Sequence, residues 1–306
     1  MILEAFQNWV IQTGLMVSLL IMVILIIRRP FARAFGANAA YALWSLPLIR
    51  LCLPGLSVPQ NWVPEFLREA PHQPGTASTF EFAENNLPTL INDSDVFAPD
   101  RSLVTEGIQW SLILISVWLT VAVLWFAYQL LQQARFRSRL VAQSSAPTTK
   151  LSREIGLAAD TVGLRHAPKV LIAPDGAGPL VTGVFKPLVV VPNNFDEIYN
   201  AEQRHFALVH EFAHVKRRDL WIALTALIFR AVNWPNPLVH YAANKLRGDQ
   251  EAACDAFVVK VTGGETAHSY AETLVKALRQ EGEGSRANAH LALSLTQSEA
   301  ENSKGD

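Results

Sequence analysis

The segment that decides the fold is residues 206–217, F-A-L-V-H-E-F-A-H-V-K-R, which contains the pattern H-E-x-x-H. Its apolar residues recur at helical spacing, so it is predicted to form a helix with one buried face. Residues four apart project from the same face of a helix, which brings the imidazoles of His210 and His214 together. Imidazole nitrogens are common zinc ligands, and Glu211 beside the first histidine can act as the general base that activates water. The segment therefore predicts a zinc site for hydrolytic chemistry.

A catalytic zinc ion needs a third protein ligand, because such sites use three side chains and leave one position for water or substrate. The best candidate is Glu251, within D-Q-E-A-A-C-D-A at residues 249–256. This segment also has helical spacing, which places Asp255 one turn beyond Glu251, where it can orient a zinc-bound histidine. Cys254 is a rival ligand, although thiolates are more typical of structural zinc sites. The predicted site comprises three ligands of one Zn²⁺ ion, one catalytic base and one supporting acid: His210, His214, Glu251; Glu211; Asp255.

The chain between His214 and Glu251 must leave the metal site and return to it. Residues 220–244 are mostly apolar, and N-W-P-N-P at residues 233–237 carries two prolines that interrupt a helix. We therefore predict a helical hairpin over about residues 218–248. Arms of roughly 22 Å are too short to cross a bilayer comfortably, so they are expected to dip into the membrane or to pack against its spanning helices. The alternative is a pair of soluble core helices.

Three short runs rich in β-branched residues precede the H-E-x-x-H helix, at residues 170–173, 181–185 and 188–191. Turn residues separate the runs, so they predict a small antiparallel sheet. An open edge of such a sheet can accept an extended peptide through main-chain hydrogen bonds. A purely structural hairpin fits the same pattern equally well.

Three apolar segments nearer the amino terminus are candidates for membrane spans, at residues 8–27, 36–56 and 107–133. An uncharged helix of the first segment's length covers the roughly 30 Å hydrocarbon layer at about 1.5 Å per residue. No basic residue precedes it, unlike the apolar core of a cleaved signal peptide, so it is expected to be retained. Arginines follow the first and third segments, at residues 28–33 and 135–139. The positive-inside rule then places the amino terminus outside and the later domain in the cytoplasm.

These elements predict a mainly α membrane protein with about three transmembrane helices and a cytoplasmic α+β, zincin-like (gluzincin) metallopeptidase domain. The membrane region is residues 1–134, the metallopeptidase domain 135–279 and a polar carboxy-terminal tail 280–306. An external loop over residues 57–106 joins the second and third spans. From residue 54 to 106, acidic residues outnumber arginines eight to two, which suits an external segment. This loop either connects two helices or binds a ligand.

The composition of the 306-residue chain excludes several classes of protein. Hydrophobic residues make up 50% of the chain and charged residues only 17%, so the chain is not intrinsically disordered. Two cysteines are too few for a disulfide scaffold. The formal net charge of -1 argues against direct nucleic-acid binding, which needs a basic surface. The expected partners are therefore membrane lipid and a protein substrate.

Five segments together resemble the membrane-embedded metallopeptidases of the BlaR/MecR antirepressor type, and the likeness covers most of residues 8–275. The segments are H-E-F-A-H-V-K-R-R-D-L at 210–220, N-W-P-N-P-L-V-H at 233–240, E-A-A-C-D-A at 251–256, R-R at 28–29 ahead of Y-A-L-W at 41–44, and G-V-F-K-P-L-V-V-V-P at 183–192. The resemblance implies zinc binding by His210, His214 and Glu251, and catalysis by Glu211. It also implies a bacterial cytoplasmic (inner) membrane location, with the peptidase domain facing the cytoplasm.

Members of this type sense an external compound and trigger proteolysis that relieves a transcriptional repressor. Their best-known sensor binds penicillin and needs S-x-x-K and K-T-G, neither of which occurs in this sequence. The resemblance therefore concerns the peptidase portion and not β-lactam sensing.

The expected function is that of an integral-membrane zinc metalloendopeptidase that hydrolyses a cytoplasmic protein, and also itself. The resemblance implies that this activity serves signalling that relieves a transcriptional repressor. The competing hypothesis is a non-catalytic membrane signal transducer in which zinc only ties helices together. Glu211 favours catalysis, because a structural zinc site needs no proton acceptor beside its first histidine.

Overall fold

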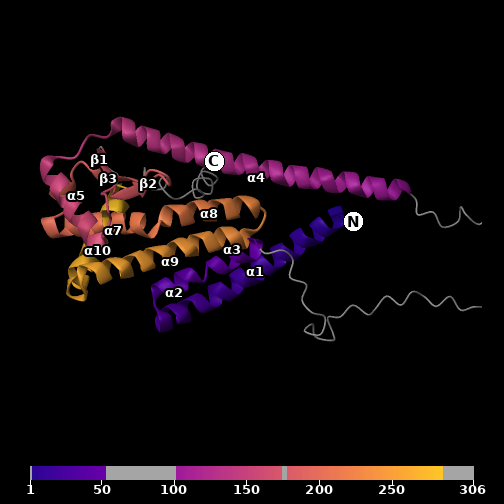
Figure 1. Cartoon of the computed structure of the whole chain (residues 1–306), viewed down its shortest axis with the longest axis horizontal. Coiled ribbons are helices and arrows are strands. Elements are labelled where there is room, and N and C mark those ends of the chain that lie inside the picture. Colours follow the sequence, from indigo (N-terminus) through magenta and orange to yellow (C-terminus); the bar gives the residue numbers. More distant parts are fainter. Residues whose placement is uncertain (1, 53–100, 174–177, 285–306) are drawn as a thin grey trace, which may run out of the picture.

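The computed structural model describes residues 2–52, 101–173 and 178–284, and this part of the chain is mostly helical with one three-stranded sheet. The helices have these bounds: α1 Ile2–Phe35, α2 Ala37–Ala42, α3 Ser45–Cys52, α4 Arg101–Gln143, α5 Thr149–Val162, α6 Phe195–Ile198, α7 Ala201–Arg217, α8 Asp219–Val232, α9 Pro237–Thr262, η3 Gly264–Thr266 and α10 Ala267–Gly284. The strands are β1 Lys169–Ala173, β2 Leu180–Thr182 and β3 Leu188–Pro192. Figure 1 shows the strands with α5, α7 and α10 at one end of the molecule, and α1 and α4 extending away from it.

Among the described residues, two helices are long and apolar enough to cross a membrane, by length and composition: Gln12–Phe35 within α1 and Leu112–Gln143 within α4. Large apolar side chains along both helices are exposed, among them Leu19, Ile26 and Leu124. Exposed apolar surface of this extent suits contact with lipid. The segment predicted as the first span, residues 8–27, lies inside α1, and the segment predicted as the third, residues 107–133, lies inside α4. The predicted external loop, residues 57–106, lies outside the described residues up to residue 100, and residues 101–106 belong to α4.

The described part of the segment predicted as the second span, residues 36–56, is not one continuous helix. The structure has two short helices there, α2 and α3, which are separated by a turn at Leu43 and Trp44. Pro47 explains the break, because proline has no N–H to donate to the carbonyl of Leu43 and its ring collides with that carbonyl in a continuous helix. Both short helices pack back along α1, as Figure 1 shows.

The sheet is mixed rather than purely antiparallel as predicted. β3 lies in the centre, paired in parallel with β1 and antiparallel with β2, so that Lys169 faces Leu188 and Val181 faces Val189. All five residues of β3 are buried, which means that both of its faces are covered. A continuous run of apolar residues without alternation is typical of such a central strand. The prediction of a small antiparallel sheet therefore missed the parallel pairing of β1 with β3.

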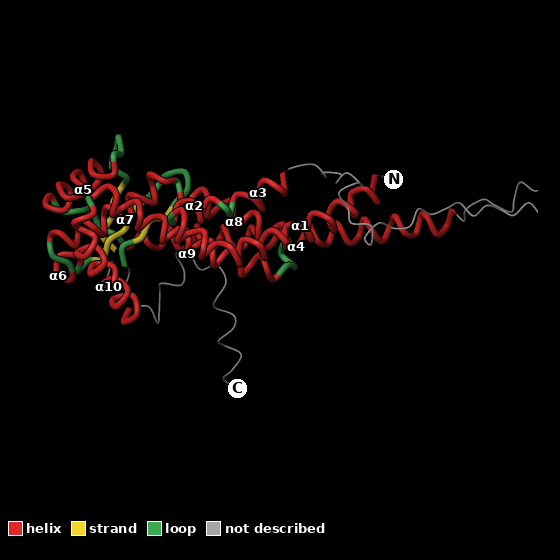
Figure 2. The backbone as a smooth tube through the Cα atoms, turned by 90° about the horizontal axis from the view of Figure 1, so that it is seen from below, coloured by secondary structure: helices red, strands yellow, loops and turns green. Residues whose placement is uncertain are grey.

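Helix α7 lies in the middle of the end of the molecule that holds the strands, which we call the compact end. Figure 2 shows α5, α6 and α10 around the strands there. A capping box starts the helix: the side chain of Asn200 accepts from the backbone N–H of Gln203, and the Gln203 side chain accepts from the backbone N–H of Asn200. Val209 and Phe212 of α7 are fully buried in the core. This burial fixes the rotation of the helix, and hence the direction in which its two histidines point.

The segment predicted to form a helical hairpin contains α8 and α9, and the chain reverses between Val232 and Pro237. Asn236 caps α9 by accepting from the backbone N–H of Leu238, and Pro237 occupies the first turn, where a missing N–H costs nothing. Helix α8 packs against α4, and α9 packs against α1 and α2, so the hairpin contacts both apolar helices. The second arm is longer than predicted: α9 runs past residue 248 to Thr262.

Removal of a buried ion pair between α7 and α5 is expected to destabilise the compact end. Arg204, 5% exposed, donates to both carboxylate oxygens of Glu154 at 2.9 and 2.6 Å and to the carbonyl of Tyr199 at 2.9 Å. Arg204→Met is expected to lower the free energy of unfolding by about 3 kcal/mol, because it leaves a largely buried carboxylate without its partner. Urea denaturation in detergent, followed by tryptophan fluorescence, measures this loss.

The control is Lys150→Met, which removes an exposed ion pair between α5 and α6, with Asp196 at 3.6 Å. Its expected cost is below about 1 kcal/mol, since exposed pairs contribute little. Equal decreases in the free energy of unfolding for the two variants would contradict the larger stabilisation that we assign to the Arg204–Glu154 ion pair.

Candidate metal centre

The structure brings His210, His214 and Glu251 together at the contact of α7 with α9. The Nε2 atoms of the two histidines lie 3.2 Å apart, and Glu251 Oε2 lies 3.5 Å from His210 Nε2 and 3.4 Å from His214 Nε2. Two ligands bound at about 2.0–2.1 Å to one ion at a tetrahedral angle lie about 3.3 Å from each other. The three atoms therefore form a triangle of the size that one zinc ion requires.

Each histidine is held through its other ring nitrogen. His214 Nδ1 lies 2.8 Å from Asp219 Oδ2, and His210 Nδ1 lies 2.8 Å from the Tyr270 hydroxyl, which donates to Asp255 Oδ1 at 2.7 Å. A carboxylate accepts the Nδ1–H of His214, and the Tyr270 oxygen accepts that of His210 while its own proton goes to Asp255. Both Nε2 lone pairs are then available to a cation. Such hydrogen bonds are typical of metal-binding histidines.

Asp255 lies where the helical spacing predicted it, 3.4 Å from His210 Nδ1, but its shorter contact with that ring runs through Tyr270. Sequence reasoning missed Tyr270 and Asp219. The signal for Asp219 was an acid at the first position of the helix that follows the motif, five residues after His214. Tyr270 comes from α10 and carries no local sequence signal for its role.

The electrostatics of the cluster favour bound positive charge. Burial lowers the pKa of His210, but hydrogen bonds to Asp255 and Glu251 outweigh it and raise that pKa to about 10. Burial likewise opposes the charged form of His214, while Asp219 and other neighbours raise its pKa above the ordinary value. Burial raises the pKa of the Glu251 carboxyl, yet the two histidines lower it overall. The surrounding carboxylates thus stabilise a cation at the two imidazoles.

Two further residues of the motifs lie at the cluster. Glu211 is buried, 8% exposed, between the two histidines in the sequence of α7. Cys254 is fully buried, and its sulfur lies with the ligand nitrogens of His210 and His214 in a group whose atoms are all within 4.8 Å of one another. The Cys254 thiol also lies 3.7 Å from the carbonyl oxygen of His210. Glu251 and Cys254 are therefore both placed to complete a three-ligand set with the histidines.

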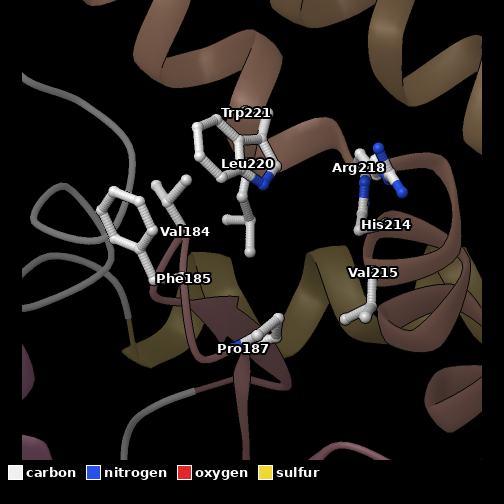
Figure 3. Close-up of a pocket in the computed structure, with 8 residues that line it drawn as sticks. All are labelled: Val184, Phe185, Pro187, His214, Val215, Arg218, Leu220 and Trp221. Atoms are coloured by element: carbon white, nitrogen blue, oxygen red, sulfur yellow. The ribbon is translucent and has the colours of Figure 1, made fainter.

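A cavity of about 400 Å³ adjoins His214. Figure 3 shows apolar side chains around it, and its lining residues are Val184, Phe185, Pro187, His214, Val215, Arg218, Leu220 and Trp221. The rings of Phe185 and Trp221 meet edge to face with centroids 5.2 Å apart, and both side chains are exposed. The loop between β2 and β3 and the start of α8 thus form an apolar wall beside the metal centre.

In the described part of the chain, two apolar helices are long enough to cross a membrane, and two histidines and a carboxylate form one cluster. These features are typical of a membrane-associated metallopeptidase. The family model described as BlaR1 peptidase M56 matches residues 8–299, so the chain belongs to this family. Its membership confirms the resemblance predicted from the motifs and makes the chain a metallopeptidase-type hydrolase.

The chain is similar to two groups of curated relatives. It is 29% identical over 115 residues to the regulatory protein BlaR1 of Bacillus licheniformis, and 29% identical over 98 residues to the methicillin resistance mecR1 protein of Staphylococcus aureus (strain Mu50). These matches cover 37% and 32% of this chain, but only 19% and 17% of the relatives. The chain thus spans less than a fifth of the length of either relative.

Proposed function

We propose that the chain is an integral-membrane zinc metalloendopeptidase in which His210, His214 and Glu251 bind one Zn²⁺ ion and Glu211 is the catalytic base. The observation that carries this proposal is the triangle of ligand atoms with sides of 3.2, 3.4 and 3.5 Å. Two imidazoles and a carboxylate are the ligand set of catalytic zinc sites that keep one position for water.

The residues of the chain supply the proton transfers of amide hydrolysis. Zinc, when bound, polarises the scissile carbonyl and lowers the pKa of water towards about 7. Glu211 accepts the proton of the attacking water and delivers it to the nitrogen of the leaving amine. Asp219 and the Tyr270–Asp255 pair hold the two imidazoles in orientation throughout. The apolar cavity beside His214 suits an apolar side chain of the peptide next to the scissile bond.

The cellular arrangement belongs to the same proposal. The arginines at residues 28–33 and 135–139 favour a cytoplasmic metal centre and an outer amino terminus. A cytoplasmic protein, and the chain itself, are then the substrates. Because the relatives are named a regulatory protein and a methicillin resistance protein, we infer that this proteolysis serves transmembrane signalling and relieves a transcriptional repressor. The zincin-like fold of the domain and the association of the hairpin with lipid are parts of this proposal.

The second candidate is a signal transducer with a structural zinc site. Cys254 favours it, since a buried thiol within reach of both histidines is a ligand typical of structural sites. In that case the metal would fasten α7 to α9 without hydrolysis.

Removal of the metal separates the two functions. Treatment of the detergent-solubilised chain with a chelator is expected to abolish cleavage of a quenched-fluorescent peptide library, and added Zn²⁺ is expected to restore it. Elemental analysis gives the metal content, and circular dichroism the helix content. Retained cleavage after complete removal of metal would contradict the proposal. A metal-bound chain that cleaves neither the library nor itself would favour the transducer.

A further inference from the structure

The side chain of Arg217 connects four helices around the metal centre. It extends from the last residue of α7, and its Nε donates to Asp219 Oδ2 at 3.2 Å. Its Nη1 carries two N–H groups and donates to the carbonyl of Ala253 in α9 at 2.9 Å and to Asn38 Oδ1 in α2 at 3.0 Å. The guanidinium also lies over the ring of Tyr41 in α2, 5.5 Å from its centroid. One residue thus links α7, α8, α9 and α2.

The atom that Arg217 holds is the one that orients a predicted ligand. Asp219 Oδ2 accepts from both Arg217 Nε and His214 Nδ1. The carboxylate is only 4% exposed, and its other oxygen has no hydrogen-bond partner within the described part of the chain. The position of Oδ2 therefore depends strongly on the guanidinium. A displacement of Asp219 Oδ2 would rotate the His214 ring and move its Nε2 atom away from Glu251.

Helix α2 is coupled to this carboxylate although it comes from the amino-terminal membrane region. Asn38 and Tyr41 lie three residues apart and thus on the same face of α2, and both contact Arg217. Among the described residues, the Tyr41 hydroxyl is buried without a hydrogen-bond partner. This hydroxyl therefore retains the capacity to donate or accept a hydrogen bond beside Arg217.

A second contact ties the same membrane region to the other side of the site. Arg28 of α1 donates to Asp249 Oδ1 at 2.7 Å, and Trp44 Nε1, in the turn after α2, donates to Asp249 Oδ2 at 2.8 Å. Asp249 precedes Glu251 by two residues in α9. The α1–α2 segment therefore holds α9 close to Glu251. Through Arg217 it also contacts Asp219, which orients His214.

We propose that Arg217 is a positioning residue that fixes Asp219 against His214 and, through its contact with Asn38, makes this geometry depend on the position of α2. The proposal rests on the proposed zinc site, whose regulation it concerns. Arginine is suited to the role, because its planar fork reaches several acceptors at once, whereas lysine has a single nitrogen. Displacement of α2 along α9 would release the guanidinium from Asn38, loosen Asp219 and weaken the binding of metal.

The test measures metal binding rather than cleavage. We expect Arg217→Met to weaken Zn²⁺ binding by about 10- to 100-fold, the usual effect of losing a contact that orients a ligand. The d–d absorption of the Co²⁺-substituted protein should change, because the field at the metal changes. Competition with a chromophoric chelator gives the affinity of the detergent-solubilised full chain. Arg153→Met, at an exposed arginine of α5, is the matched control and should leave both readouts unchanged.

The dependence on α2 is tested with Asn38→Ala, an exposed position where folding is not at risk. It should weaken Zn²⁺ binding by about threefold in the wild type and have no effect in Arg217→Met, since residues that act through one contact are not additive. If Arg217→Met does not fold, Arg217→Lys replaces it, because one ammonium cannot span Asp219, Asn38 and Ala253.

Two outcomes would overturn the proposal: wild-type affinity and an unchanged cobalt spectrum in the Arg217 variant, or additive losses in the double variant. A wild-type chain that binds neither Zn²⁺ nor Co²⁺ would instead contradict the proposed function itself, so the two failures are distinguishable.

Discussion

Replacing Glu211 with glutamine is expected to lower kcat/KM for peptide cleavage by about 10³-fold while leaving bound zinc in place. A positioned general base contributes roughly 10²–10⁴-fold, and glutamine has the shape of glutamate but cannot accept the proton of water. The neighbouring imidazoles of His210 and His214 and the carboxylate of Glu251 remain, so the affinity for Zn²⁺ should stay within a few-fold of the wild type. Initial rates on a quenched-fluorescent peptide library and elemental analysis measure the two quantities on the same sample.

Glu202→Gln is the matched control, because it makes the same chemical change on an exposed position of α7. It should leave cleavage unchanged. Loss of zinc together with activity in Glu211→Gln would show that Glu211 supports the metal site rather than the proton transfer. Undiminished cleavage would remove Glu211 from the mechanism.

The parts of the structure that the sequence predicted are those governed by local patterns. The spacing of His210 and His214 on one helix follows from helical geometry alone, and the reversal before Pro237 follows from the loss of a backbone donor. The position of Glu251 was predicted differently, from the need of one ion for three ligands, and the structure places its Oε2 atom 3.5 and 3.4 Å from the Nε2 atoms of His210 and His214.

Most of the parts that were missed depend on contacts between distant segments. The exception is the break within residues 36–52, which lies at Leu43 and Trp44, shortly before Pro47. The unbroken apolar run at 188–191 is typical of a central strand, but the parallel pairing with β1 and the antiparallel pairing with β2 depend on segments outside it. Tyr270 reaches His210 from another helix, and such a contact is decided by the packing of α10 on α7.

The identity of the third ligand is the second change with a large expected effect. Glu251→Ala should weaken Zn²⁺ binding by about 10²- to 10³-fold, because a binding free energy of roughly 10–16 kcal/mol is shared among about four ligands. Cys254→Ser, which preserves the shape of the side chain, should leave the affinity within a few-fold of the wild type. Competition with a chromophoric chelator ranks the two variants, and peptide cleavage should follow the same order.

The physical reason for this order is the charge of the two candidate groups. The two histidines keep the Glu251 carboxyl ionised by lowering its pKa, and its Oε2 already lies at 3.4 and 3.5 Å from both Nε2 atoms. Cys254 lies fully buried against the carbonyl of His210, and thiolate ligands are more typical of structural zinc sites than of catalytic ones. The Co²⁺-substituted wild type should therefore lack the near-ultraviolet charge-transfer band of a cobalt thiolate. A strong band of that kind, abolished by Cys254→Ser together with metal binding, would assign the third ligand to Cys254 and favour the structural zinc site over the hydrolytic one.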